Sequence, residues 1–212
     1  PIRTFATVPA RPPQRSNADM ARALLARHFQ LEGGSSLPVL TRFETPVRVT
    51  VTGRPPPTLL ADLDALILRL RREARIDHQR VASSTPAQIT IEAVSRARIE
   101  QVLPQAACFV VPNVSSLDEY RRNRRAPQTD WKNLRQRDRL AIVVPNDVSP
   151  QELRDCLHEE LAQALGPLND LYRLADSIFN DDNVQAVLTG FDMLILRATY
   201  DAQLATGMTR QE

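Results

Sequence analysis

A carboxylate occupies the middle of an apolar face on the helix predicted to begin at Pro150 and to end at Gly166. An α-helix advances about 100° per residue, which places Glu160 among Leu157, Leu161 and Ala164. Burying a charge is costly, so such a carboxylate needs hydrogen-bond donors, a cation or a proton. Glu160 is therefore interpreted either as a general base or as a structural carboxylate in a polar network.

Two more oxygen-bearing side chains, Glu159 and Gln163, border the same face. Their spacing of four residues suits two ligands of one ion on a helix. Zinc prefers His, Cys, Asp and Glu, whereas an amide oxygen is a poor zinc ligand. His158 is not expected to supply a further metal ligand, since it is predicted to point away from this face together with Ala162. The sequence thus predicts no bound metal, with zinc, or calcium on oxygen ligands, as the alternative.

The order of residues on this helix resembles the H-E-x-x-H signature of zinc metalloproteases in its metzincin form. The resemblance places Glu159 and Gln163 at the positions of the two histidine ligands and Glu160 at the general base. Gly166 takes the position of the turn glycine, and Asn169 that of the third ligand. It implies a degenerate E-E-x-x-Q site that keeps the acid/base residue and changes every ligand.

Two further segments extend the resemblance. The metzincin turn beneath the metal has a counterpart in Ser177, Ile178, Phe179 and Asn180, with Phe179 where the methionine would be. Thr189 and Asp192 then begin a last helix as its cap and third residue. Asp170, one position out of register, and Asp181 with Asp182 are alternative oxygen ligands for a cation.

The whole chain is also similar to an uncharacterised family of predicted proteobacterial lipoproteins. The similarity rests on residues 37–44, Cys156 with the E-E-x-x-Q residues, Asn169–Asp170, residues 177–181 and Gly207–Met208. It implies a periplasmic or secreted location, with a lipid anchor upstream of Pro1 as an alternative form. It implies no established activity.

Hydrophobic periodicity predicts the remaining elements. Strands are expected at residues 47–51, 88–94, 106–111 and 140–144, and helices at residues 17–30 and 55–77. The predicted fold is α+β and zincin-like or metzincin-like. It has a mixed, twisted sheet of four to five strands, with a long helix and the signature helix on one side of the sheet, and a mostly helical C-terminal part.

The predicted organisation is an N-terminal arm and helix (residues 1–36) and one domain (37–212). This domain is divided into an upper half (37–166) and a lower half (167–212).

The chain contains two cysteines, Cys108 and Cys156. Two free thiols in a cytosolic protein are one interpretation. A disulfide formed in an oxidising compartment is the other and is the one we predict; it would join a strand to the signature helix.

Positive charge gathers in a polar insertion at residues 113–138. Arg121, Arg122, Arg124 and Arg125 are interpreted as a solvated loop or as a cationic rim beside the cleft. Trp131, in the same insertion, either anchors the loop or stacks on a ligand. The net charge of +2 is too small to indicate a nucleic-acid partner.

Three functions remain open from the sequence. The first is a catalytically degenerate metzincin-like envelope domain that binds a protein, peptide or other envelope partner. The second is a metal-dependent peptidase or hydrolase that uses Glu160 as general base with a nonstandard metal. The third is a purely structural subunit of an envelope complex.

Overall fold

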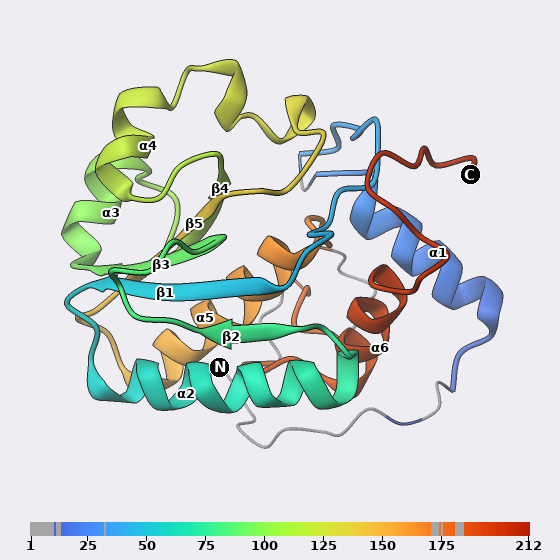
Figure 1. Cartoon of the computed structure of the whole chain (residues 1–212), viewed down its shortest axis with the longest axis horizontal. Helices are drawn as coiled ribbons and strands as arrows, with labels where there is room; N and C mark the ends of the chain where they lie inside the picture. Colours follow the sequence, from blue (N-terminus) through green and yellow to red (C-terminus); the bar gives the residue numbers. More distant parts are fainter. Residues whose placement is uncertain (1–10, 12–13, 32, 171–173, 175, 181–184) are drawn as a thin grey trace.

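A mixed five-stranded sheet forms the centre of the protein (Figure 1). The computed structural model describes residues 11, 14–31, 33–170, 174, 176–180 and 185–212. The strands are β1 (Val47–Gly53), β2 (His78–Arg80), β3 (Ile89–Val94), β4 (Phe109–Pro112) and β5 (Leu140–Pro145). Their order is β2-β1-β3-β5-β4, and only the pairing of β4 with β5 is antiparallel. The predicted α+β class and mixed sheet are confirmed.

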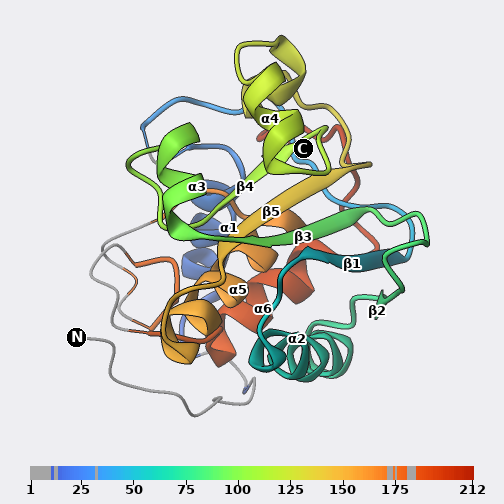
Figure 2. The same cartoon turned by 90° about the vertical axis from the view of Figure 1, so that its left-hand side faces the viewer.

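Side chains that alternate along the strands form a core on each face of the sheet. Val49, Ile91 and Ile142 belong to the larger core, whereas Ala141 and Val143 belong to the core on the opposite face. Every residue of β5 is buried, as expected for a continuous apolar strand covered on both sides. Figure 2 shows α3 and α4 on one face, and α2, α5 and α6 on the other.

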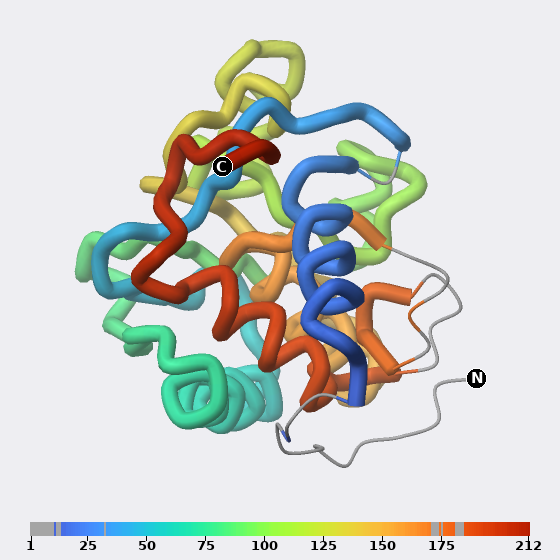
Figure 3. The backbone as a smooth tube through the Cα atoms, turned by 90° about the vertical axis from the view of Figure 1, so that its right-hand side faces the viewer, coloured from blue at the N-terminus to red at the C-terminus, as the bar shows by residue number. Residues whose placement is uncertain are grey.

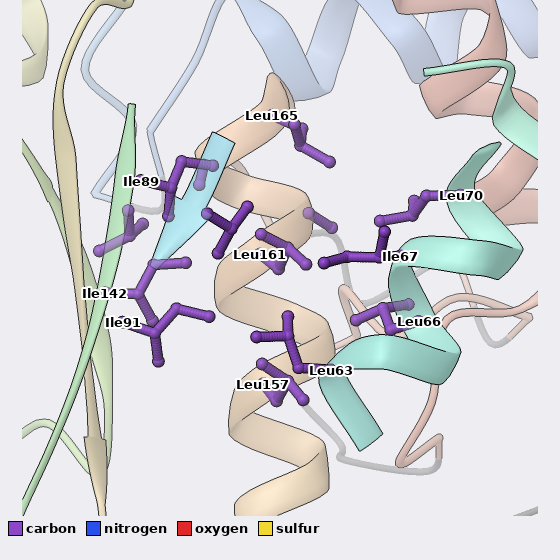
Figure 4. Close-up of a cluster of buried hydrophobic side chains, with 14 of the residues drawn as sticks. Leu63, Leu66, Ile67, Leu70, Ile89, Ile91, Ile142, Leu157, Leu161 and Leu165 are labelled. Carbon is purple, nitrogen blue, oxygen red and sulfur yellow. The ribbon is translucent and has the colours of Figure 1, made fainter. Parts of the chain in front are cut away.

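The larger core lies between the sheet and two helices, α2 (Pro57–Arg69) and α5 (Pro150–Leu165). A π-helical turn, η1 (Leu70–Ala74), extends α2 and ends at Arg75, which adopts a left-handed conformation with φ of 58°. In Figure 4, Leu63 and Ile67 of α2 point toward Leu157 and Leu161 of α5. The two helices therefore pack on the same side of the sheet, as predicted.

The opposite face carries α3 (Arg96–Val102) and α4 (Leu117–Asn123), two helices of 7 residues each that the sequence did not predict. Both are anchored by few apolar residues: α3 buries Ile99 and Val102, and α4 buries only Leu117. Two short 3-10 turns, η2 (Pro127–Thr129) and η3 (Trp131–Asn133), follow α4. The predicted loop at residues 113–138 is thus an ordered lobe.

Helix α1 (Asn17–His28) follows its cap Ser16, whose hydroxyl accepts a hydrogen bond from the main-chain N–H of Asp19. It packs along α6 (Gly190–Thr199) in Figure 3. Most of residues 1–15, the first part of the predicted N-terminal arm and helix, lies outside the described residues.

The expectation of a mostly helical C-terminal part is wrong for the residues that the structure describes. Between residues 167 and 212, α6 is the one helix in that described part. Side-chain hydrogen bonds, rather than helical ones, hold the segment before α6. None of the helices in the described ranges is both long enough and apolar enough to cross a membrane.

Candidate functional site

The N-terminus of α5 is fixed by a cap and by a disulfide. Ser149 accepts a 3.2 Å hydrogen bond from the main-chain N–H of Glu152. The carboxylate of Glu152 pairs with Arg96. One turn further on, Cys156 is bonded to Cys108, with 5.9 Å between the Cα atoms. The predicted disulfide is confirmed, and it ties α5 to the start of β4.

Helix α5 is buried on all sides from Glu160 to its end, and His158 is buried as well, which corrects the predicted outward face. Ala162 and His158 are 0% and 5% exposed. His158 Nδ1 accepts a 3.1 Å hydrogen bond from the N–H of Leu188, a residue 30 positions away. Burial, together with the positive charges of Arg69 and Arg154, lowers the pKa of His158 to about 3. His158 is therefore a neutral structural histidine.

Glu160 lies at a cavity of about 680 Å³ between α5 and β4, and is itself only 5% exposed. The predicted burial of this carboxylate is confirmed. Several segments line the cavity: Leu31, Gly33, Leu103, Gln105, Ala106, Ala107, Cys108, Phe109, Val110, Trp131, Glu159, Glu160, Gln163, Leu168 and Asp170. The structure thus brings together Glu159, Glu160 and Gln163, the three helix residues that the sequence selected.

The cavity combines an edge strand with polar side chains. Phe109 and Val110 belong to β4, which pairs with β5 on one side only and therefore forms an edge of the sheet (Figure 2). Opposite β4, Glu160 and Gln163 of α5 place a carboxylate and an amide at the wall. Leucine side chains from three loops complete the lining. The lining is thus more polar than apolar: it contains two glutamates, two glutamines and an aspartate beside the apolar residues.

The predicted third ligand position, Asn169, does not line the cavity. Its side-chain amide donates a 3.1 Å hydrogen bond to the main-chain oxygen of Ala26 in α1. Its neighbour Asp170 lines the cavity instead. Among the described residues, no group of three His, Cys, Asp or Glu side chains has a geometry that could hold a metal ion. The alternative oxygen ligands Asp181 and Asp182 lie outside the described residues.

Arg137 closes the C-terminal end of α5. Its Nη1 donates to the main-chain oxygens of Gln163 and Ala164 at 2.6 and 2.7 Å, and its Nη2 donates to that of Gly166 at 2.8 Å. These carbonyl groups form the negative end of the helix dipole, which stabilises a cation there. Burial lowers the pKa of Arg137 to about 10. The arginine is thus held by carbonyl oxygens rather than by a carboxylate.

Trp131 connects this cap to the cavity. The guanidinium of Arg137 lies 5.1 Å from the centre of the indole ring, and the half-buried tryptophan also lines the cavity. It packs against the larger core. Trp131 therefore anchors the lobe, which was one of the two interpretations from the sequence. It also forms part of the cavity wall.

Gly166 permits a close contact between α5 and two other helices. A Cβ atom at this position would lie 2.7 Å from Cε1 of His28 and 2.9 Å from Cγ2 of Thr199. His28 Nε2 lies 2.8 Å from the hydroxyl of Thr199, which itself donates to the main-chain oxygen of Ile195. Burial lowers the pKa of His28 to about 3, with the charges of Arg137 and Arg27 adding to it.

The predicted turn at residues 177–180 is held by a buried ionic network. Asp192 accepts hydrogen bonds from the hydroxyl of Ser177 at 2.5 Å and from the N–H of Ile178 at 3.0 Å. Arg27 pairs with Asp192 at 3.3 Å, also donates to Ser177, and lies 4.6 Å from the ring centre of Phe179. Phe179 is fully buried in the larger core, and Asn180 is buried as well. The turn is thereby joined to the start of α6.

None of the four arginines proposed as a rim lines the cavity. Arg121, Arg122, Arg124 and Arg125 are exposed on the lobe that contains α4. Arg124 donates a 3.4 Å hydrogen bond to the main-chain oxygen of Val102, at the end of α3. The following residue, Leu103, lines the cavity, so the lobe is next to the cavity wall without forming it.

A family model for proteins of unknown function, DUF2927, matches residues 17–212. The chain belongs to this family. Membership of an uncharacterised family was expected and is confirmed; for this DUF2927 protein, the lipoprotein origin and the zincin relationship stay predictions. No curated protein matches the chain.

The sequence analysis did not predict the buried arginines of this DUF2927 protein, of which Arg27 and Arg137 are the most completely buried among the described residues. Both are at most 2% exposed. Arg137 lies in a run of exposed arginines, and nothing in the local sequence distinguishes it from Arg135 or Arg139. Arg27 follows the buried Ala23 by four residues on α1, so helical spacing was the one available signal.

Proposed function

We propose that this protein is a catalytically degenerate, zincin-like envelope domain that binds an extended segment of a protein partner between β4 and α5. The observation that supports this proposal most directly is the cavity of about 680 Å³, which lies between a sheet edge and the helix that carries Glu160. A cavity of this size is within the range of ligand-binding sites.

The edge strand favours a peptide as the occupant. Along an edge strand, alternate main-chain N–H and C=O groups point away from the sheet and can pair with an added strand. β4 runs from Phe109 to Pro112, and the proline at its end has no N–H to donate. An added segment of three to four residues would therefore pair beside Phe109 and Val110, which already line the cavity.

The chemistry of the polar residues favours binding over zinc-dependent hydrolysis. Glu159 is the one good zinc ligand among the three positions that would hold metal, since Gln163 and Asn169 are amides. Asn169 also bonds to α1 and not to the cavity. Glu160, in contrast, keeps the position expected of an acid/base residue, and in this proposal it acts as a structural carboxylate.

The disulfide supports the proposed envelope location. Disulfides persist in secreted and periplasmic proteins and are rare in the cytosol. The Cys108–Cys156 bond lies at the cavity itself, because Cys108 is one of its lining residues. In an oxidising compartment this disulfide would persist and would stabilise the wall of the binding site.

Selection from a library of random peptides tests the binding role. We expect the protein to enrich peptides that lose at least about tenfold in affinity when Ala107→Trp blocks the cavity, where Ala107 is an exposed lining residue. Ala82→Trp is the matched control, since Ala82 is exposed in the β2–β3 loop. Equal binding by both variants, or no enrichment, would refute the proposal.

The same peptides test the hydrolase alternative. The protein would be purified without chelator, its metal content measured, and the peptides incubated with it. Stoichiometric metal together with cleavage that Glu160→Gln abolishes would establish the hydrolase instead.

A further inference from the structure

The lobe that contains α4 carries a concentration of positive charge that the proposed cavity does not use. Residues 120–135 contain six cationic side chains and one acidic side chain. The rest of the chain contains 21 cationic and 24 acidic side chains. The molecule is thus nearly neutral overall but strongly cationic at one end. In Figures 1 and 2 the lobe projects beyond the sheet, on the face opposite α2 and α5.

The lobe is ordered, which fixes the positions of its cations. The hydroxyl of Thr129 donates to the main-chain oxygens of Asn123 and Ala126 at 3.0 and 2.9 Å. Asn113 and Asn133 donate from their side chains to Gln128 and Pro127 at 2.8 and 3.1 Å. These bonds join α4, η2 and the start of the lobe, so the charges are displayed on a folded surface.

The acidic residues of α4 do not neutralise its exposed arginines. Asp118 pairs with Arg98 at 3.0 Å, and Glu119 pairs with Arg139 at 2.9 Å. Within the part of the chain that the structure describes, no ion pair involves Arg121, Arg122, Arg124 or Arg125. In this described part, four exposed arginines without an ion-pair partner therefore lie within five residues of chain, and Arg124 alone among them donates to a main-chain oxygen, that of Val102.

The chemistry of this surface fits phosphate groups. Guanidinium forks match phosphate oxygens in bidentate geometry, and five of the six cations are arginines. Protein–protein interfaces have an apolar or aromatic centre. The lobe offers none: Leu68, in α2, is the one large apolar side chain that is exposed in the described ranges.

We propose that the cationic part of this lobe, residues 120–135, docks on an anionic phospholipid surface. A convex cationic surface without apolar side chains makes electrostatic contact with headgroups and does not insert among acyl chains. Nucleic acid is the less favoured polyanion, because aromatic stacking platforms are absent from the exposed surface of the described lobe, where Tyr120 and Trp131 are half-buried. A disulfide-bonded protein also belongs to compartments in which membranes, and not nucleic acids, supply the anionic surface.

Vesicle sedimentation tests the proposal. Wild-type protein is expected to bind vesicles of phosphatidylcholine with 30% phosphatidylglycerol, to bind pure phosphatidylcholine poorly, and to be released by about 0.5 M salt. Replacing Arg121, Arg122, Arg124 and Arg125 by Gln should lower the partition coefficient at least about tenfold. The replaced side chains are exposed, so the melting temperature should stay within a few degrees of wild type.

A matched control variant distinguishes the effect of the lobe arginines on vesicle binding from the effect of the protein's net charge. Replacing Arg71, Arg72, Arg197 and Arg210 by Gln removes four exposed charges elsewhere, and we expect at most about a twofold loss. Equal losses in both variants would show a net-charge effect and overturn the proposal. So would a lack of wild-type binding to the anionic vesicles, or tighter binding to duplex DNA than to those vesicles at equal phosphate concentration.

Discussion

Arg137 donates a 2.6 Å hydrogen bond to the main-chain oxygen of Gln163, and so joins the lobe to the end of the helix that carries Glu160. Two further carbonyl groups of α5 and the turn after it accept from the same guanidinium. Trp131, stacked beside Arg137, lines the cavity. The C-terminal end of α5 and one wall of the cavity are therefore held by a single buried cation.

Arg137→Ala should strongly destabilise the protein, because it leaves buried carbonyl groups without donors. We expect a loss of about 3–5 kcal/mol in the free energy of unfolding, measured by urea denaturation. Arg135→Ala is the control: Arg135 is exposed and should cost less than about 0.5 kcal/mol. Similar losses of unfolding free energy in the two variants would contradict the role of Arg137 as the cap at the C-terminal end of α5.

Asp192→Ala should be equally costly, because Asp192 joins the turn at residues 177–180 to α6. The substitution would leave Arg27 buried without its carboxylate, and we expect a loss of about 3–5 kcal/mol. Asp201→Ala, at an exposed position after α6, provides the comparison. The role of Asp192 would be refuted if the two variants melted at the same temperature.

The disulfide should stabilise the fold by about 4 kcal/mol on the loop-entropy model, given a separation of 48 residues. Denaturant titration of wild type against Cys108→Ser/Cys156→Ser measures this contribution. A thiol reagent should label no cysteine in the unreduced, denatured protein. Two labelled thiols would disprove the bond.

The buried histidines predict a loss of stability in mild acid. His158 has a pKa lowered by burial to about 3, so between pH 6.5 and 3 the unfolded chain binds a proton that the folded protein does not. Stability should therefore fall as the pH falls, by roughly 1.4 kcal/mol per pH unit for this histidine. Asp155 acts in the opposite direction, because burial and the nearby Glu152 raise its pKa to about 6.

A difference measurement isolates His158 from the other titrating groups. His158→Gln keeps an acceptor for the N–H of Leu188 and cannot titrate. Between pH 6 and pH 5, the unfolding free energy of this variant should fall by roughly 1.4 kcal/mol less than that of wild type. Equal slopes would show that folding does not lower the pKa of His158.

The sequence was most informative where the relevant interactions are local. The start of α5 and the main strands follow from short patterns, and each was predicted correctly. Contacts between distant segments were the ones missed. His158 is buried because residues near Leu188 return to cover it, and Arg137 reaches α5 from a different part of the chain.

The short elements were missed for a different reason. Helices α3 and α4 bury one or two apolar residues each, too few to produce a periodic pattern. Asn169 was placed in the site by alignment with a signature, but a hydrogen bond to Ala26 turns it toward α1. Helical spacing predicted the burial of Glu160, although α5 is buried on more sides than expected.

Substitution of Glu160 distinguishes a structural carboxylate from a general base. Glu160→Gln keeps the shape of the side chain and should change the free energy of unfolding by less than about 1 kcal/mol, whereas Glu160→Ala should cost roughly 1–3 kcal/mol. Chemical denaturation of the two variants measures both values. Equal, near-zero costs would contradict a structural role.

The most direct measurement of the central claim follows a cavity-selected peptide by mass spectrometry during incubation with wild-type protein and with Glu160→Gln, while binding is recorded in parallel. We predict that both proteins bind the peptide and that it stays intact with each. Cleavage by wild type, together with binding but no cleavage by Glu160→Gln, would contradict the account and identify Glu160 as a catalytic base.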